Sequence, residues 1–334
     1  MPTAVSLFSG CGGFDWGATQ AGVEVVWAND NNVNAATAYQ ALFPGAEFVR
    51  GDIRKVGTFP EADILIGCYP CTGFSLAARR RWRKRGERDL RANDGNFLYE
   101  EFLRALTLVQ PRYLFVENVR GMRSAEGGWF LEEQIRVYSE LGYKVESALL
   151  NARDFGLAQT RQRLFLVGVH EEVEGFEYEF PVPTHGQVGG PAFTTLEDAI
   201  GGMPAWPDGE YCEAEFHGHY LTRNRKRGWD QQSYTIVADS HHVPLHPMGE
   251  PMVFVEKDKW ALQGDENRRL SWRECARVQG LPEDGLEVIE RLDARYQAIG
   301  NAVPPVFGEV LLGPVVAHEQ GVAVAQEVAE LAIA

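Results

Sequence analysis

Two cysteines stand close together in the segment Gly67-Cys68-Tyr69-Pro70-Cys71, which follows a short apolar run. Three kinds of chemistry suit such a pair: a redox couple, half of a zinc site, or a loop in which Cys71 alone is a nucleophile. A zinc site would need a second ligand pair at a matching spacing, and the sequence contains none. The redox and nucleophile interpretations stay open on these residues alone, as does an inert, buried cysteine.

A carboxylate and two guanidinium groups lie at the ends of other apolar runs. Glu117 ends one such run, and packing does not explain an acid there, because buried carboxylates need partners. Arg161 and Arg163 stand at the start of the run at residues 163–169, and strand alternation would place both on one face. They could then hold one anionic or carbonyl-bearing ligand together, whereas solvated surface arginines are the alternative.

A glycine-rich turn, Ser9-Gly10-Cys11-Gly12-Gly13, follows the first apolar run of the chain. Glycines at a strand-to-helix turn allow a ligand to approach the backbone closely, and the helix offers its N-terminus. Asp30 follows about twenty residues later, where a carboxylate can hold ribose hydroxyls, and Asp52 after the third run is a candidate adenine contact. The glycine spacing differs from GxGxxG, so it favours a cofactor with one nucleoside; glycines needed only for packing are the alternative.

These candidate residues follow short β-branched runs that alternate with longer mixed segments through the first 170 residues. Strands are predicted at residues 3–8, 23–28, 47–51, 62–67, 113–118, 144–150 and 163–169, and helices at 96–109 and 127–142. Such alternation is typical of βαβ units in a parallel sheet, whose ligands bind at the carboxyl ends of the strands. If the fourth and fifth strands are neighbours, Cys71 and Glu117 project into one crevice.

The texture of the chain changes after residue 170. Pro, Gly, His and aromatic residues interrupt every run, so residues 171–269 are predicted to form a smaller, loop- and strand-rich domain. Helical patterns resume in residues 270–334, which are expected to complete the first domain of residues 1–170. The predicted fold class is therefore α/β, with a mostly parallel sheet and a second domain.

Composition argues against several classes of protein. No stretch approaches the roughly eighteen consecutive apolar residues of a membrane span, and the first residues lack the basic start of a signal peptide. The five cysteines are scattered and odd in number, unlike a secreted disulfide framework, so the cytoplasm is expected. The 47 acidic and 32 basic residues give a formal net charge of −15, which over the whole chain argues against a nucleic-acid partner.

Seven blocks of sequence together resemble those of the DNA (cytosine-5)-methyltransferases. They are SLFSGCGGF, NDGNFLYEEF, GCYPCTGFS, FVENVRGM, AQTRQRLFLVG, RRLSWRECARVQGLP and AIGNAVPP. The resemblance extends over most of the chain except residues 171–220. The resemblance implies a Rossmann-like, S-adenosylmethionine-dependent methyltransferase domain, with residues 171–269 as the target-recognition domain. Within the family, the sequence resembles the bacterial and archaeal methyltransferases of type II restriction-modification systems.

The resemblance also implies roles for individual residues. Cys71 corresponds to the nucleophile, Glu117 to the acid beside the target base, Arg163 to the arginine that holds that base, and Arg161 to a supporting, phosphate-side arginine. The implied S-adenosylmethionine contacts are Phe8, Gly10, Gly12, Gly13, Asp30, Asp52, Ile53, Pro70, Leu98, Asn301 and Val303. The implied DNA contacts are Ser75, Arg223 and Arg225, and no metal site is expected. Thr72 departs from the family, which usually carries Gln after the nucleophile.

The chemistry implied by the resemblance explains these residue types. A Cys71 thiolate that attacks carbon 6 of cytosine turns the ring into an enamine and so activates carbon 5. Glu117 and Arg163 can stabilise the charge that develops on the ring, at nitrogen 3 with the exocyclic amine and at oxygen 2 respectively. The base must leave the stacked duplex to reach them. RNA methylation, a catalytically silent homologue and a thiol oxidoreductase using Cys68 and Cys71 are the alternatives.

Charge must then be considered by position. Half of the 32 basic residues fall in three stretches, residues 79–91, 223–227 and 268–277, which could face duplex DNA across one cleft. The segment from residue 220 resembles the subgroup that methylates GGCC, with Arg223 and Arg225 as candidates for guanine recognition. His241 stands where that subgroup carries another arginine. The expected partners are duplex DNA and a cognate restriction endonuclease acting on the same site; the expected state is a monomer without membrane contact.

Overall fold

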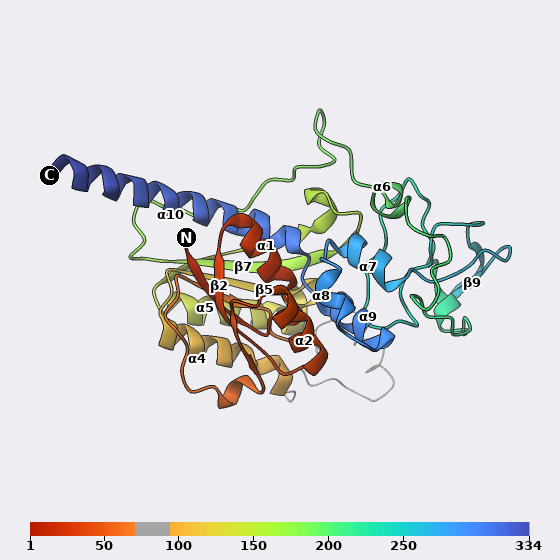
Figure 1. Ribbon diagram of the computed structural model, residues 1–334, viewed down its shortest axis with the longest axis horizontal. Coiled ribbons are helices and arrows are strands. Elements are labelled where there is room, and N and C mark those ends of the chain that lie inside the picture. Colours follow the sequence, from red (N-terminus) through yellow and green to blue (C-terminus); the bar gives the residue numbers. More distant parts are fainter. Residues whose placement is uncertain (71–93, 334) are drawn as a thin grey trace.

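The computed structural model describes residues 1–70 and 94–333 and is built around one large sheet (Figure 1). Its seven strands are β1 (Thr3–Leu7), β2 (Glu24–Asp30), β3 (Glu47–Arg50), β4 (Ile64–Gly67), β5 (Tyr113–Val119), β6 (Tyr143–Asn151) and β7 (Gln162–His170). They lie in the order β3-β2-β1-β4-β5-β7-β6, and β7 runs antiparallel to both of its neighbours. The remaining pairs are parallel, so the predicted mostly parallel sheet is confirmed.

Helices cover both faces of this sheet, which explains why the central strand β4 and the first four residues of β5 are continuous apolar runs. In β5, Tyr113 and Phe115 pack on one face and Leu114 and Val116 on the other. The first face is covered by α1 (Gly13–Ala21) and α10 (Pro305–Ile333), and the second by α4 (Tyr99–Val109) and α5 (Trp129–Ser139). Figure 1 shows α10 along one side of the sheet and α4 along the other.

The other helical segments connect or flank these layers. They are α2 (Val33–Leu42), α6 (Leu196–Ile200), α7 (Trp272–Gln279), α8 (Asp284–Glu287) and α9 (Leu292–Asn301), with 3-10 turns at Ile53–Lys55, Asp94–Phe97, Arg120–Gly128, Ala152–Phe155 and Tyr220–Thr222. The Asn32 side chain caps α2 by accepting from two backbone N–H groups of its first turn. The seven strands of the large sheet and the helices α4 and α5 lie close to the bounds predicted from the sequence.

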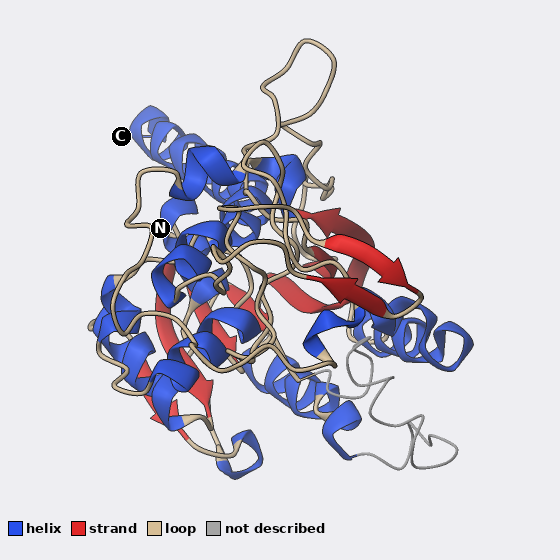
Figure 2. Cartoon of the chain, turned by 90° about the vertical axis from the view of Figure 1, so that its right-hand side faces the viewer, coloured by secondary structure: helices blue, strands red, loops and turns tan. Residues whose placement is uncertain are grey.

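Residues 171–269 form a region that is mainly loop (Figure 2). Its only named strands are the short hairpin β8 (Val253–Glu256) and β9 (Lys259–Ala261), and its one α-helix is α6. Its core combines Leu196, Ile236 and Val243 with Trp272 of α7 and Tyr296 of α9. Helices α7 and α9 therefore pack with the loop-rich region, whereas α10 packs with the sheet.

One apolar stretch, Leu292–Gly321, is long and apolar enough to cross a membrane by length and composition alone. It comprises α9 and the first part of α10, and 67% of its apolar window is buried inside the protein. Phe307 and Leu311 of α10 belong to the core beneath the sheet. This burial explains the apolar composition as that of a core helix.

Candidate active site

The carboxyl ends of β1, β4 and β5 meet at one edge of the sheet. Leu7, Gly67 and Val116 are register partners across these three strands, and the Cys68 N–H donates to the Leu7 carbonyl at 3.1 Å. The predicted adjacency of the fourth and fifth strands is thus confirmed. Cys71 itself lies outside the described residues, as do Thr72, Ser75 and the basic stretch at residues 79–91. The chain enters that segment directly from this edge.

Glu117 and Arg163 form a buried ion pair at the same edge. The Arg163 Nε lies 2.7 Å from the Glu117 Oε1, and the two side chains are 14% and 11% exposed. Antiparallel pairing of β5 with β7 brings them together, because Glu117 faces Phe165 and Val119 faces Arg163 in the register. Burial raises the pKa of Glu117, although the charges of Arg163 and Arg161 oppose this. Such a carboxyl group is suited to sharing a proton with a ligand.

Arg161 lies in a buried network of backbone carbonyls, and its charge acts on Glu117. Its side chain is 1% exposed, and its guanidinium donates to the carbonyls of Ile236, Gly300 and Ala302, each at 2.9 Å. It therefore joins the start of β7 to the loop-rich region and to the end of α9. That Arg161 and Arg163 hold one ligand together remains a prediction, because strand alternation fixes the face of a side chain but not how far it extends.

The turn after β1 has an unusual backbone. Phe8 and Gly10 both have φ 57° and Gly12 has φ 85°, in the left-handed region that a residue like Phe rarely adopts. A Cβ on Gly12 would lie 2.4 Å from Phe43, and one on Gly13 would lie 2.2 Å from the Val303 carbonyl. Gly10 differs, since a Cβ there would meet no atom within 4 Å. Packing thus explains two of the three glycines, and the third leaves the backbone open.

Asp30 holds this turn against the end of β2. Its Oδ2 accepts from the Gly10 N–H at 2.9 Å and its Oδ1 accepts from the Asn32 N–H at 2.8 Å. Burial raises the pKa of Asp30, and these backbone hydrogen bonds counteract that effect. Asp30 is therefore close to the glycine turn, as its spacing predicted.

The other predicted cofactor residues lie in more varied environments. The Asp52 carboxylate is bound by Arg54, whose hydrogen bonds lower the pKa of Asp52 to about 2. Ile53 is 2% exposed within the core, and Val303 packs behind Gly13. Leu98 immediately precedes α4 and its carbonyl accepts from the first turn of that helix; Pro70 and Asn301 are exposed.

The loop-rich region uses most of its arginines internally. Arg225 is 5% exposed, donates to the carbonyls of Tyr220 and His242 at 3.0 and 2.8 Å, and stacks on the Tyr220 ring. These contacts give Arg225 a structural role in the loop-rich region, and its recognition of guanine remains a prediction. Arg223 is exposed on extended backbone, and its predicted DNA contact remains a prediction.

The basic stretch at residues 268–277 is likewise not a free basic surface. Arg268 is 2% exposed and forms a two-pronged pair with Glu274, both contacts at 2.7 Å. Arg269 donates to backbone carbonyls, whereas Arg273 and Arg277 pair with Glu283. Its positive charge is therefore largely neutralised by partners within the protein, and contact with DNA remains a prediction.

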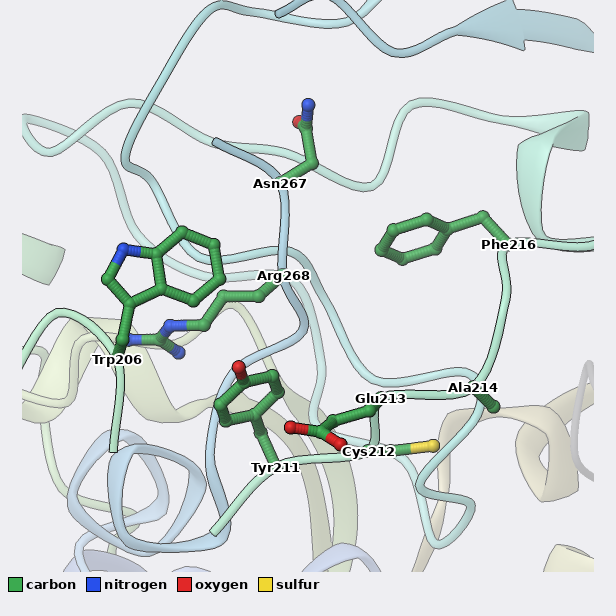
Figure 3. A pocket seen from close by; sticks show the side chains of 8 residues that line it. All are labelled: Trp206, Tyr211, Cys212, Glu213, Ala214, Phe216, Asn267 and Arg268. Atoms are coloured by element: carbon green, nitrogen blue, oxygen red, sulfur yellow. The ribbon is translucent and has the colours of Figure 1, made fainter. Parts of the chain in front are cut away.

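A cavity of about 230 Å³ lies in the loop-rich region beside Arg268 (Figure 3). Its lining residues are Trp206, Tyr211, Cys212, Glu213, Ala214, Phe216, Asn267 and Arg268. None of the predicted site residues lines it. Among the described residues no group of three His, Cys, Asp or Glu side chains could hold a metal ion.

Comparison with known proteins assigns the chain to a family. Residues 3–315 match the family described as C-5 cytosine-specific DNA methylase. The chain belongs to this family. The Bacillus subtilis type II methyltransferase M.BsuRI is 37% identical over 93% of this chain and 78% of its own length, and M.BspRI of Lysinibacillus sphaericus is 38% identical over 90% and 78%. The solved methyltransferase EhMeth of Entamoeba histolytica has the same fold, with a TM-score of 0.68 at 15% identity, over 94% of this chain and 98% of its own.

The cysteine next to β4 does not suit a redox couple in this methyltransferase. Burial raises the pKa of the Cys68 thiol well above its ordinary value, and the charges of Glu117, Asp15 and Asp30 add to the effect. A redox-active thiol needs an accessible, electropositive setting that lowers its pKa. Cys68 has the opposite setting.

Two buried polar groups of the methyltransferase were not anticipated from the sequence. Asp15, in the first turn of α1, is 1% exposed and accepts from the Ser6 and Tyr39 hydroxyls. Gln134, on the buried face of α5, is 1% exposed and accepts from the Tyr69 hydroxyl. A polar residue in the apolar stripe of a helix was the available signal, at Gln134 between Phe130 and Tyr138.

Proposed function

We propose that this DNA cytosine-5 methyltransferase flips a cytosine out of duplex DNA and methylates its carbon 5 through a covalent Cys71 adduct. The observation that carries the proposal is the buried Glu117–Arg163 pair at the carboxyl edge of the sheet. Cys71 follows the neighbouring strand by four residues, counted from Gly67. An acid and a fixed cation beside the nucleophile are what a cytosine ring requires during attack.

The proposed reaction begins when the Cys71 thiolate bonds to carbon 6. The electrons of the carbon 5–carbon 6 double bond shift to form a carbon 4–carbon 5 double bond, those of the carbon 4–nitrogen 3 double bond move onto nitrogen 3, and Glu117 supplies a proton or hydrogen bond there. The raised pKa of Glu117 supports this role, because a carboxyl group that protonates more readily donates at higher pH. Arg163 faces the same carboxylate and would hold oxygen 2 of the ring.

S-adenosylmethionine supplies the electrophilic methyl group for carbon 5, as use of this cofactor by the family implies. Two features of the chain fit it: the open backbone at Gly10, and the Asp30 carboxylate that suits ribose hydroxyls. Phe8, Gly12, Gly13, Asp52, Ile53, Pro70, Leu98, Asn301 and Val303 are the further contacts of the proposal. After transfer, a water molecule takes the carbon 5 proton, the electrons of that bond restore the carbon 5–carbon 6 double bond, and the bond between Cys71 and carbon 6 breaks, which regenerates the thiolate.

The partners belong to the same proposal. Duplex DNA is the substrate, Arg223 and Ser75 contact it, and a cognate restriction endonuclease cuts the same unmethylated site. The relatives named as type II methyltransferases support the restriction-modification setting. A monomer in the cytoplasm, where such DNA lies, is sufficient for the reaction. GGCC is the first recognition sequence to test.

The experiment is transfer of a labelled methyl group from S-adenosylmethionine to duplex DNA, followed by digestion to nucleosides. Label in 5-methylcytosine is the expected result, and Glu117→Gln should reduce the rate of methyl transfer by at least about 100-fold. Label in N4-methylcytosine or N6-methyladenine would contradict the proposal. Bisulfite sequencing of the same DNA then reports the surrounding sequence.

A further inference from the structure

Tyr69 lies two residues after β4 and two residues before Cys71, and its side chain points into the core. It is 4% exposed, and its ring packs edge-on against Phe8 and tilted against Phe102, with centroids 6.2 and 6.1 Å apart. Its hydroxyl donates to the Gln134 Oε1 and lies 3.5 Å from the Tyr138 hydroxyl. The segment that leads into Cys71 is therefore tied to α5 by a buried polar contact.

Gln134 also contacts the segment that follows Glu117. Its Nε2 donates to the Met122 sulfur at 3.7 Å, and Met122 lies five residues after Glu117 in the Arg120–Gly128 turn. Phe130, Gln134 and Tyr138 occupy one buried face of α5 at intervals of four residues. One amide on that face thus touches both the chain entering the Cys71 segment and the chain leaving the Glu117 strand.

Backbone chemistry makes Tyr69 an effective place to fix the chain. Proline fixes its own φ near about −65° and restricts the residue before it, so Tyr69 and Pro70 have few free backbone torsions. The Cys68 N–H is already bound to the Leu7 carbonyl at 3.1 Å. Holding the Tyr69 ring and hydroxyl therefore constrains the direction in which the chain leaves the sheet toward Cys71.

We infer that Tyr69 and Gln134 form a positioning pair that holds the end of the chain leaving β4, at Tyr69 and Pro70 just before Cys71, relative to the Glu117 strand without touching the substrate. The inference rests on the proposed function of Cys71 and Glu117. Core stability alone does not require this pair, because Phe and Leu would fill these positions without burying a hydroxyl and an amide. The polar pair instead fixes the orientation of the Tyr69 side chain relative to α5, because a hydrogen bond constrains the angle between its two groups as well as their distance.

The test compares three variants with the wild-type protein. Tyr69→Phe removes the donor, and Tyr69→Phe with Gln134→Leu removes both partners, so that the Gln134 amide is not left buried without its donor; only the Tyr138 hydroxyl then loses its contact with Tyr69. Tyr138→Phe is the matched control, because it deletes a hydroxyl from the same cluster but is not part of the Cys71 segment. Single-turnover methyl transfer, cofactor and DNA dissociation constants, urea unfolding and hydrogen exchange at the Cys68 amide are measured on each.

The expected result is a loss of about tenfold or more in the single-turnover rate for Tyr69→Phe and for the double variant. Cofactor and DNA affinities should stay within about twofold, Tyr138→Phe should keep the wild-type rate, and the double variant should regain unfolding stability without regaining rate. The Cys68 amide should exchange faster in the Tyr69 variants only.

Three results would overturn the inference: a wild-type rate in Tyr69→Phe, an equal loss in Tyr138→Phe, or recovery of both rate and stability in the double variant. A wild-type protein that transfers no methyl group would instead contradict the proposed function. In that case the exchange comparison still decides the inference, since it needs no activity. Unchanged exchange at the Cys68 amide in the Tyr69 variants would then overturn it.

Discussion

Replacing Asp15 by Asn should stabilise the protein at neutral pH. Asp15 is 1% exposed, and its two oxygens accept from the neutral Ser6 and Tyr39 hydroxyls at 2.9 and 2.8 Å. Burial raises the pKa of Asp15 from 3.8 to about 6, and the two hydroxyls only partly offset it. Asn keeps the shape and can bond to both hydroxyls without carrying a charge.

The sign of the effect follows from proton binding. The folded protein holds the Asp15 proton more tightly than the unfolded chain, so the free energy of unfolding falls as pH rises from about 3.8 to about 6. At pH values above about 6, the difference between the two pKa values corresponds to a loss of ~3 kcal/mol in the free energy of unfolding of the wild-type protein. The advantage of Asp15→Asn over the wild type should therefore widen by about 1.5 kcal/mol between pH 5 and pH 8.

Urea unfolding of both proteins at several pH values between 5 and 8 measures this difference directly. Glu61→Gln removes a negative charge from an exposed position and controls for net charge. A wild-type-to-variant difference that is constant across the pH range would show that Asp15 does not titrate there, and the reasoning from burial would be wrong. Loss of stability in Asp15→Asn at every pH would contradict it equally.

Four further substitutions separate structural from functional side chains. Arg225→Ala should lower the free energy of unfolding by about 2–4 kcal/mol, measured by urea unfolding, because it leaves the carbonyls of Tyr220 and His242 without their hydrogen-bond donor. Arg223→Ala should leave stability unchanged and weaken binding to duplex DNA, measured by titration at fixed salt; an unchanged affinity would exclude it as a contact. Arg268→Ala should cost about 3–5 kcal/mol, since it leaves Glu274 charged and unpaired in the core, and a loss under 1 kcal/mol would refute the buried pair. Cys68→Ser should retain methyl transfer. Loss of methyl transfer in a variant that remains folded would instead favour the interpretation of Cys68 and Cys71 as a redox couple.

The sheet and its covering helices were predictable because their patterns are local. β5 begins with four apolar residues in a row, at 113–116, because both faces are covered there, and α5 repeats its buried residues every four positions. The position of Glu117 was predictable for the same reason: an acid at the end of such a run needs a partner. Its pairing with Arg163 depends on the antiparallel placement of β7, which no local pattern specifies.

The roles of the arginines were not predictable from charge alone. In the loop-rich region few backbone carbonyls are paired in strands or helices, so buried side chains satisfy them instead. Arg225, Lys226 and Arg269 each donate to at least two carbonyls there. A cluster of basic residues in this sequence is therefore as compatible with the core of a loop-rich region as with a DNA-facing surface. The net charge of the whole chain, −15, does not distinguish between these two possibilities.

The most direct test of the central claim is trapping of the nucleophile on DNA. Duplex DNA carrying 5-fluorocytosine at the target position is incubated with the protein and S-adenosylmethionine, and the product is digested and sequenced by mass spectrometry. Fluorine cannot leave as a proton does, so a stable adduct through Cys71 is expected, while Cys71→Ser should bind the same DNA without forming it. Methyl transfer to carbon 5 with no adduct, or an adduct through Cys68, would contradict the account.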